Sequence, residues 1–323
     1  MNKIKISIII PHYRSVPLLK RALESIGTAA DTEVIVVDDK SNLDSGERSL
    51  LEEICSGEGR FLYDNTTDRK GAGVCRNIGL SHARGEWLLF VDADDFLVEG
   101  WYERVKEYTE KKPDLVYFPP TDRNDATGEK SGRTKMYEEL VTGCRRKPTH
   151  RHLTELKYSF CTPWSKLIRR SVVTKHDIRF DETPVSNDIM FMTKCAFYAE
   201  KCAVAKEPVY CATRSGNTLT SKKSKENFKI RIEVLSRRYA FLKQNLSKAD
   251  FRSTHIGQLV FGQMVCVFAD GYGFGTFLWL LSFYREHKMK ILGAGFLDPV
   301  SFIRKAKMLI SWFGDIKKAR KKQ

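Results

Sequence analysis

A regular alternation of short apolar runs and amphipathic segments over residues 1–120 restricts the fold of this chain more than any other feature. The run KISIII at 5–10 is β-branched and typical of a buried strand, and residues 16–27 place apolar side chains at helical spacing before Gly27. The same pattern predicts further strands at 33–39, 60–65, 86–92 and 114–119, and helices at 46–55, 71–83 and 98–110. Such alternation is typical of an α/β fold in which helices cover both faces of a mostly parallel central sheet.

The pattern changes after this region. Residues 120–150 are polar and contain glycine, so we expect an irregular excursion there, whereas residues 151–220 return to mixed structure. From about residue 226 the apolar side chains recur at helical spacing, which predicts a helical C-terminal region.

Polar side chains follow the predicted strands where each strand ends. These groups are Pro11-His12-Tyr13-Arg14, Asp38-Asp39, Asp64-Asn65 and Asp92-Ala93-Asp94-Asp95. Ligands of open α/β sheets bind outside the carboxyl ends of the strands. The sequence therefore predicts a binding site at this edge of the sheet.

The stretch FVDADDFL, residues 90–97, crowds three carboxylates into four positions. Like charges at this spacing repel one another, and each resists losing its water, so a bound cation would stabilise them. Carboxylates suit Mg²⁺ or Mn²⁺, which typically bind through one or two of them together with substrate phosphates. Acidic residues after a strand also cap the next turn, and the spacing alone leaves both interpretations open.

Composition limits the possible partners and compartment. The 323 residues contain 55 Lys and Arg against 40 Asp and Glu, a net charge of +15, which indicates nucleic acid, a phosphorylated substrate or a membrane surface as partner. The eight cysteines form no Cys-x-x-Cys pair, so we expect reduced, mostly buried thiols in a cytosolic protein. The apolar run at the N-terminus is too short for a signal peptide, and we find no apolar segment long enough to span a membrane.

Three segments, SIIIPHYRSVPLLKRALESI, EVIVVDDKSNLDS and GAGVCRNIGLSHARGEWLLFVDADDFL, occur in an order and at intervals that resemble the bacterial family 2 glycosyltransferases, which have the GT-A fold. The later TPWSKLIRRSVVTKHDIRFDE and NDIMF resemble a further block of that family, so the resemblance covers about residues 4–220. It implies a catalytic domain at 1–225, with a nucleotide-sugar half at about 1–120 and an acceptor half at about 120–225. The helical region at 226–323 would follow it.

The resemblance also implies roles for individual residues. Its nucleotide-binding positions correspond here to Pro11, His12, Tyr13, Asp38, Asp39, Lys70, Arg76 and Asp92. Asp94 would ligate Mn²⁺ or Mg²⁺, Asp188 would be the catalytic base, and Trp164 and Asn187 would contact the acceptor. Two positions depart from the family pattern: Cys75 replaces an alanine before Arg76, and Asn187 replaces the glutamate of a Glu-Asp pair. Alternatives are a surface ion pair for Arg76, a helix cap for Asp188 and a core position for Trp164.

The implied reaction is a metal-dependent, inverting transfer of a hexosyl or N-acetylhexosaminyl group from a UDP-sugar. The acceptor would be a glycan or a lipid-linked molecule in bacterial surface polysaccharide synthesis. The metal would help UDP leave while Asp188 takes a proton from the attacking hydroxyl. We find no Gln-x-x-Arg-Trp motif of the processive synthases, so we expect one sugar to be added per encounter.

The C-terminal segment 301–323 contains eight Lys or Arg and one Asp, interleaved with aromatic and aliphatic residues. This pattern predicts an amphipathic segment on an anionic bilayer, and hence a cytoplasmic protein held peripherally at the inner face of the cell membrane. The alternative is a helix packed on the catalytic domain with a solvated basic end.

Three other functions fit less well. A sugar-nucleotide-forming nucleotidyltransferase would carry a glycine-rich, basic loop after the first strand, but PHYRSVPLL has no glycine. A nucleic-acid-binding protein would show a recognisable motif, whereas the basic residues concentrate in the tail, so we expect no nucleic-acid partner. In an NAD-dependent oxidoreductase the glycine signature would be complete, but GAGVCRNIG matches it only in part and follows the third strand.

Overall fold

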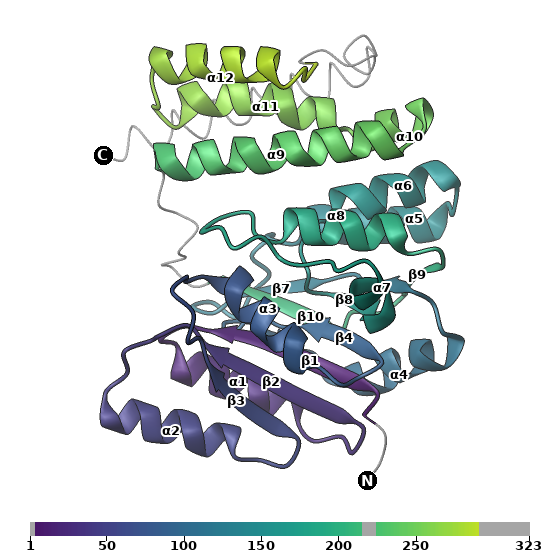
Figure 1. Ribbon diagram of the computed structural model, residues 1–323. Coiled ribbons are helices and arrows are strands. Elements are labelled where there is room, and N and C mark those ends of the chain that lie inside the picture. Colours follow the sequence, from purple (N-terminus) through teal and green to yellow (C-terminus); the bar gives the residue numbers. More distant parts are fainter. Residues whose placement is uncertain (1–3, 215–223, 291–323) are drawn as a thin grey trace. The chain divides into compact units, whose positions relative to one another are not determined.

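The computed structural model describes residues 4–214 and 224–290 of the chain (Figure 1). Contacts divide the chain into two compact units, residues 1–234 and 235–323. The division falls within helix α9 (Lys225–Asn245). The predicted domain limits, at 225 and 226, stay a prediction.

A seven-stranded sheet in the order β3-β2-β1-β4-β8-β6-β9 forms the centre of the first unit. Its strands are β1 (Ile6–His12), β2 (Thr32–Asp38), β3 (Arg60–Asp64), β4 (Trp87–Phe90), β6 (Leu115–Tyr117), β8 (Lys166–Arg169) and β9 (Cys202–Val204). Only β8 runs antiparallel to its neighbours, β4 and β6. The predicted mostly parallel sheet is therefore confirmed, and the five predicted strands form within a few residues of their expected limits.

Helices cover this sheet as the spacing of apolar residues predicts. They are α1 (Val16–Ile26), α2 (Ser45–Cys55), α3 (Ala72–His82) and α4 (Trp101–Lys111). Helix α2 begins with a capping box in which Asp44 accepts from the amide of Glu47 and the Glu47 carboxylate accepts in return. Helix α3 lies across β1 and β2 (Figure 1), where Gly79 packs directly on Ile9.

A second, three-stranded sheet was not predicted. It consists of β5 (Phe96–Leu97), β7 (Thr121–Asn124) and β10 (Tyr210–Arg214), with β10 in the middle. These strands are two to five residues long and come from distant parts of the chain. The sheet brings β10 beside the aspartate-rich segment that follows β4.

The prediction that residues 120–150 are irregular was wrong, because helix α5 (Lys135–Arg146) forms there and buries Val141 and Cys144. The Asp122 carboxylate organises the turn before α5 by accepting hydrogen bonds from the backbone amides of residues 131, 132 and 134. Helices α6 (His150–Ser159), α7 (Arg170–Lys175) and α8 (Ile189–Tyr198) complete this half of the unit. Helix α6 packs against both α5 and α8.

The described part of the second unit, residues 235–290, is helical, as predicted. After α9 come α10 (Lys248–Ser253), α11 (Ile256–Ala269) and α12 (Phe274–Glu286). Helices α11 and α12 pack together, and the Tyr284 hydroxyl donates to the Val260 carbonyl over 2.9 Å. The predicted amphipathic segment at 301–323 lies outside the described residues. Among the helices that the structure does describe, we find none with the length and apolar character needed to cross a membrane.

The close approach of α3 to β1 gives a test of the fold. An alanine Cβ at position 79 would lie 2.5 Å from Ile9 Cγ2, whereas at Gly143 in α5 it would meet no atom within 4 Å. Gly79→Ala should lower the free energy of unfolding by about 1–3 kcal/mol through overpacking. Gly143→Ala, the control, should raise it by about 0.5–1 kcal/mol because alanine favours the helix. Denaturant titration measures both, and equal effects would contradict this packing.

Candidate active site

His12 and Asp38 form a buried pair at the carboxyl ends of β1 and β2. The parallel register places the two residues directly opposite each other, and His12 Nδ1 lies 2.7 Å from Asp38 Oδ1. The Asp38 carboxylate also accepts from the backbone amide and the hydroxyl of Ser41. Burial raises the pKa of Asp38, but the hydrogen bonds from His12 and Ser41 outweigh it, so the pKa is lowered overall.

The neighbouring Asp39 serves a different segment. Its carboxylate accepts from the Asn65 side chain over 2.8 Å and from the Gly71 amide over 2.7 Å. These bonds hold the segment between β3 and α3. Among the other residues predicted to bind the nucleotide, Tyr13 and Lys70 are exposed beside this edge.

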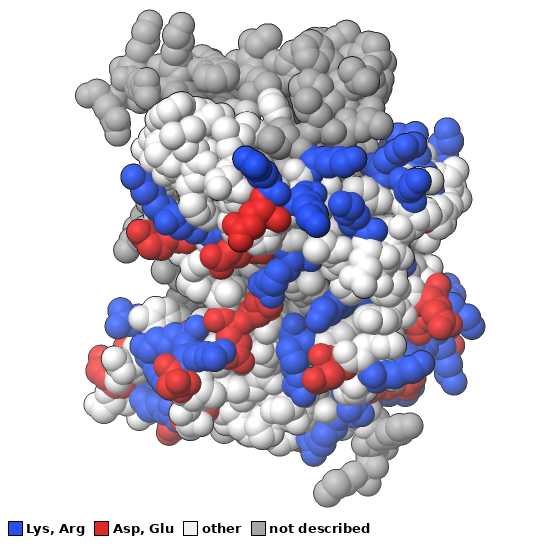
Figure 2. All heavy atoms as spheres, turned by 45° about the horizontal axis from the view of Figure 1, so that its top comes forward, with Lys and Arg blue, Asp and Glu red and all other residues white. Residues whose placement is uncertain are grey.

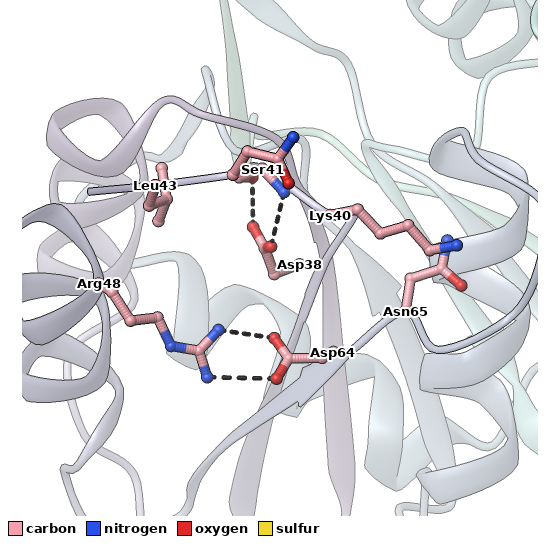
Figure 3. Close-up of a pocket in the computed structure, with 8 residues that line it drawn as sticks. Asp38, Lys40, Ser41, Leu43, Arg48, Asp64 and Asn65 are labelled. Carbon is pink, nitrogen blue, oxygen red and sulfur yellow. Dashed lines mark hydrogen bonds and ion pairs between the residues drawn. The ribbon is translucent and has the colours of Figure 1, made fainter. Parts of the chain in front are cut away.

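A polar pocket of about 240 Å³ opens at the ends of β2 and β3 (Figure 3). Asp38 and Ser41 line one side of it, and Arg48 pairs with Asp64 over 2.7 Å on the other. The sequence predicted Asp38 here, but it gave no indication of Arg48.

The aspartate-rich turn after β4 brings three carboxylates together. Ligand oxygens of Asp92, Asp94 and Asp95 all lie within 4.8 Å of one another. Asp95 is fully buried and accepts from the Tyr210 hydroxyl over 2.5 Å and from the Thr213 amide over 2.7 Å. Asp94 is half-buried, and no other described residue donates a hydrogen bond to its carboxylate.

The electrostatics of this turn fit a divalent cation. Burial raises the pKa of Asp94, and the charge of Asp92 raises it further. Burial together with these two neighbours raises the pKa of Asp95 to about 8. Negative charge that Arg76 balances only in part, with one carboxylate free of hydrogen bonds from its neighbours, matches the oxygen ligands that Mg²⁺ and Mn²⁺ prefer.

Arg76 links two of the predicted groups. Its guanidinium donates to Asp92 Oδ1 over 2.6 Å and to Asn187 Oδ1 over 2.9 Å, and it lies over the ring of Phe180. Arg76 is almost fully buried, so the alternative of a surface ion pair does not describe it.

Gly73, one turn before Arg76 in α3, permits this link. An alanine Cβ at this position would lie 2.2 Å from the Asp181 carbonyl and 2.9 Å from Asn187 Cβ. The absence of a side chain therefore lets α3 approach the 181–187 segment closely enough for Arg76 to reach Asn187.

Asp188 occupies the N-cap position of α8, but its carboxylate accepts no capping hydrogen bond. Desolvation by its surroundings raises the pKa of Asp188, and the nearby Arg76 opposes this shift. The carboxylate therefore does not serve as a helix cap, and it lies in electrostatic range of Arg76 and Asp92.

Trp164 lies in an aromatic cluster and is only 5% exposed. Its ring stacks on Tyr210 with centroids 5.2 Å apart and packs edge-on against Phe160 and Tyr137. The predicted acceptor contact would have to use the small exposed part of the ring.

Lys166 is a fully buried lysine that the sequence reasoning missed. Its ammonium donates to the Thr162 carbonyl over 2.7 Å and lies 3.1 Å from the centre of the Phe160 ring. Burial lowers the pKa of Lys166 well below its usual range. Tyr210 and Thr213 were also missed, because nothing near them in the sequence marks their contact with the aspartate turn.

The fold with these features is that of the GT-A glycosyltransferases. Residues 7–176, more than half of the chain, match the family described as Glycosyl transferase family 2. The chain therefore belongs to this family and is a glycosyltransferase.

Individual proteins to which the chain is similar are also glycosyltransferases by name. The chain is 24% identical over 304 residues to the putative glycosyltransferase EpsH of Bacillus subtilis (strain 168). The alignment covers 91% of this chain and 84% of EpsH. A crystal structure of S. aureus TarS 1–349 in complex with UDP-GlcNAc superposes with a TM-score of 0.65 at 20% identity, over 99% of this chain and 93% of that one. The mannosyltransferase PcManGT of Pyrobaculum calidifontis, in complex with GDP-Man and Mn²⁺, gives a TM-score of 0.52 at 16% identity. The superposition covers 96% of this chain and 81% of that chain.

The Asp38 network makes stability depend on pH. The pKa of Asp38 is lower in the folded protein than in the unfolded chain, so its ionised form stabilises the fold above the unfolded value of about 3.9. That contribution disappears as the pH falls through the folded pKa. Asp38→Asn should therefore lower the free energy of unfolding by about 2 kcal/mol at pH 7, and the difference should shrink below about pH 4.

Asp64→Asn is the control, because Asp64 is half exposed and forms a surface pair with Arg48. Denaturant unfolding of both variants between pH 3 and pH 7 is the measurement, and we expect at most about 1 kcal/mol for the control at pH 7. If Asp38→Asn destabilises the protein equally at all pH values, the lowered pKa of Asp38 in the folded state is contradicted.

Proposed function

We propose that this glycosyltransferase moves a hexosyl or N-acetylhexosaminyl group from a UDP-sugar to a hydroxyl of a glycan or lipid-linked acceptor, in bacterial surface polysaccharide synthesis. The observation that carries the proposal is the link through Arg76, which joins Asp92 of the aspartate turn to Asn187 beside Asp188. A group that binds phosphate through a metal and a group that accepts a proton would thereby share one site.

On the donor side, the exposed Tyr13 ring and Lys70 would contact the nucleotide together with Pro11. The buried network of Asp38, Asp39 and His12 would hold the backbone that surrounds it. The UDP-GlcNAc complex of TarS, which has a similar fold, supports a UDP-sugar as donor.

Asp94 would hold a divalent cation, with Asp92 kept near the ribose by its pairing with Arg76. A bound Mn²⁺ or Mg²⁺ would neutralise the diphosphate and so favour its departure. The Mn²⁺ complex of the mannosyltransferase PcManGT supports this cofactor class.

Asp188 would take the proton from the acceptor hydroxyl as the hydroxyl attacks the anomeric carbon. Its raised pKa makes the carboxylate a stronger base than an exposed aspartate. Attack from the face opposite the leaving group inverts the configuration, and no covalent intermediate is needed. Asn187 and the exposed part of Trp164 would contact the acceptor.

The organisation of the chain remains part of the proposal. A catalytic domain at 1–225, with its nucleotide-sugar half at about 1–120, would precede a helical region at 226–323. We expect no nucleic-acid partner, and on the face drawn in Figure 2 basic and acidic side chains are interspersed.

A screen of UDP-sugars tests the function directly. The purified protein is incubated with MnCl₂ and each UDP-sugar, or with a GDP- or dTDP-sugar for comparison, and the released nucleoside diphosphate is measured with and without added glycan acceptors. We expect manganese-dependent release from one hexose or N-acetylhexosamine donor. Turnover of a GDP- or dTDP-sugar alone would overturn the assignment of the nucleotide.

Replacement of the proposed base gives a second test. Asp188→Asn keeps the shape but cannot accept the proton, so kcat should fall at least about 100-fold while UDP affinity changes little. The wild-type rate should fall as the pH is lowered and Asp188 becomes protonated. Because burial raises the pKa of Asp188, this fall should begin at a higher pH than for an ordinary carboxylate, and it should be absent in the variant. Asp177→Asn, on an exposed side chain of the same half, is the control. A loss of UDP affinity with high residual kcat would make Asp188 structural.

The tail gives a third test. We propose that 301–323, rich in Lys and Arg, binds the anionic inner face of the cell membrane, where each basic residue contributes on the order of 1 kcal/mol. Full-length protein and a variant truncated after Pro299 are sedimented with anionic liposomes at low and high salt. We expect salt-sensitive binding that the truncation abolishes. Equal partitioning of both proteins would exclude the tail as an anchor.

A further inference from the structure

Strand β10 holds the aspartate turn at four points. The Tyr210 hydroxyl donates to Asp95 Oδ2 over 2.5 Å and accepts from the Asp92 amide over 3.3 Å. Three residues further along β10, the Thr213 amide donates to Asp95 Oδ1 over 2.7 Å, and its hydroxyl donates to the Asp94 carbonyl over 2.6 Å.

The Tyr210 hydroxyl has a particular place in this arrangement, because it contacts both ends of the turn. A hydroxyl can donate and accept at once, and here it connects the backbone of Asp92 with the side chain of Asp95. The turn carries three carboxylates whose mutual repulsion favours a more open conformation. The hydroxyl opposes that opening without taking any oxygen of Asp92 or Asp94 away from a ligand.

Packing fixes the position of the Tyr210 ring. The ring is fully buried and lies flat against Trp164, with an interplanar angle of 7°. Trp164 in turn belongs to a tight turn whose carbonyls at Thr162 and Trp164 accept from the buried ammonium of Lys166. The hydroxyl therefore cannot move away from the turn without disrupting this core.

We propose that Tyr210 is a positioning residue that holds the aspartate turn in the conformation in which the Asp94 carboxylate can bind a divalent cation, with Asp92 beside it. The inference rests on the proposed metal-dependent function and adds to it a residue from the acceptor half of the unit. Groups that orient metal ligands typically contribute 10–100-fold to metal affinity or activity. Tyr210 would act on Asp94 through the backbone of the turn, which it holds at the Asp92 amide and the Asp95 carboxylate.

Tyr210→Phe tests the inference because it keeps the ring and its stacking on Trp164 and removes only the hydroxyl. Binding of Mn²⁺ in the presence of UDP is measured by the electron paramagnetic resonance signal of free Mn²⁺. We expect affinity to fall by about 10-fold or more. The Mn²⁺ concentration for half-maximal turnover should rise with it, and kcat should recover partly at saturating Mn²⁺.

Tyr117→Phe is a matched control. Tyr117 is also a fully buried tyrosine of the same unit, but its hydroxyl has no hydrogen-bond partner among the described residues. Its replacement should leave Mn²⁺ binding unchanged. Asp94→Asn provides the reference for loss of a direct ligand, and circular dichroism confirms that each variant is folded at the temperature of the measurement.

The outcomes separate the inference from the function on which it rests. Wild-type Mn²⁺ affinity in Tyr210→Phe would overturn the inference alone, and so would equal losses in Tyr210→Phe and Tyr117→Phe, which would indicate a general effect on the core. If the wild-type protein takes up no Mn²⁺ with UDP, the metal-dependent function fails, and the inference fails with it. Selective loss in Tyr210→Phe supports both.

Discussion

Parallel hydrogen bonding of β1 to β2 on one side and to β4 on the other is the constraint on which the site depends. The register brings His12 opposite Asp38, and it aligns Ile9 with Phe90 so that the aspartate turn leaves the sheet at the same edge. A shift of one residue between β1 and β2 would separate His12 from Asp38 and move each side chain of the shifted strand to the opposite face of the sheet. The hydrophobic core of the sheet thus determines which polar groups meet.

The guanidinium of Arg76 then connects the aspartate turn at that edge with the segment before α8. The planar fork of Arg76 can satisfy two acceptors at once, and here these are a carboxylate of the aspartate turn and the amide of Asn187. Asn187 gives Arg76 an uncharged acceptor next to Asp188. Gly73 permits the approach of α3 that the connection requires.

Apart from Asp92, which pairs with Arg76, the carboxylates of the site fall into two classes by their hydrogen bonds. Asp38, Asp39 and Asp95 each accept at least two hydrogen bonds from neighbouring protein groups, and they hold the surrounding backbone in place. Asp94 accepts none from another described residue, and Asp188 forms no cap. The second class keeps its oxygens available for a cation or a proton, which is why we assign the chemistry to it.

The sequence by itself determined the helices of the first 120 residues, the strands that this region gives to the large, mostly parallel sheet, and the edge at which its polar groups gather, because these features follow from local periodicity and strand order. It also indicated the family and the candidate residues through three segments, and a later block, whose order and intervals resemble those of the family. It assigned the metal to Asp94 only through that resemblance, and it could not reveal that Asp95 is bonded to Tyr210, that Trp164 stacks on Tyr210 or that α5 forms within 135–146. Only the tertiary structure decided these points. Asp95 and Tyr210 are 115 positions apart in the chain, and whether a carboxylate is used by the protein or left for a ligand depends on such long-range contacts rather than on its neighbours in sequence.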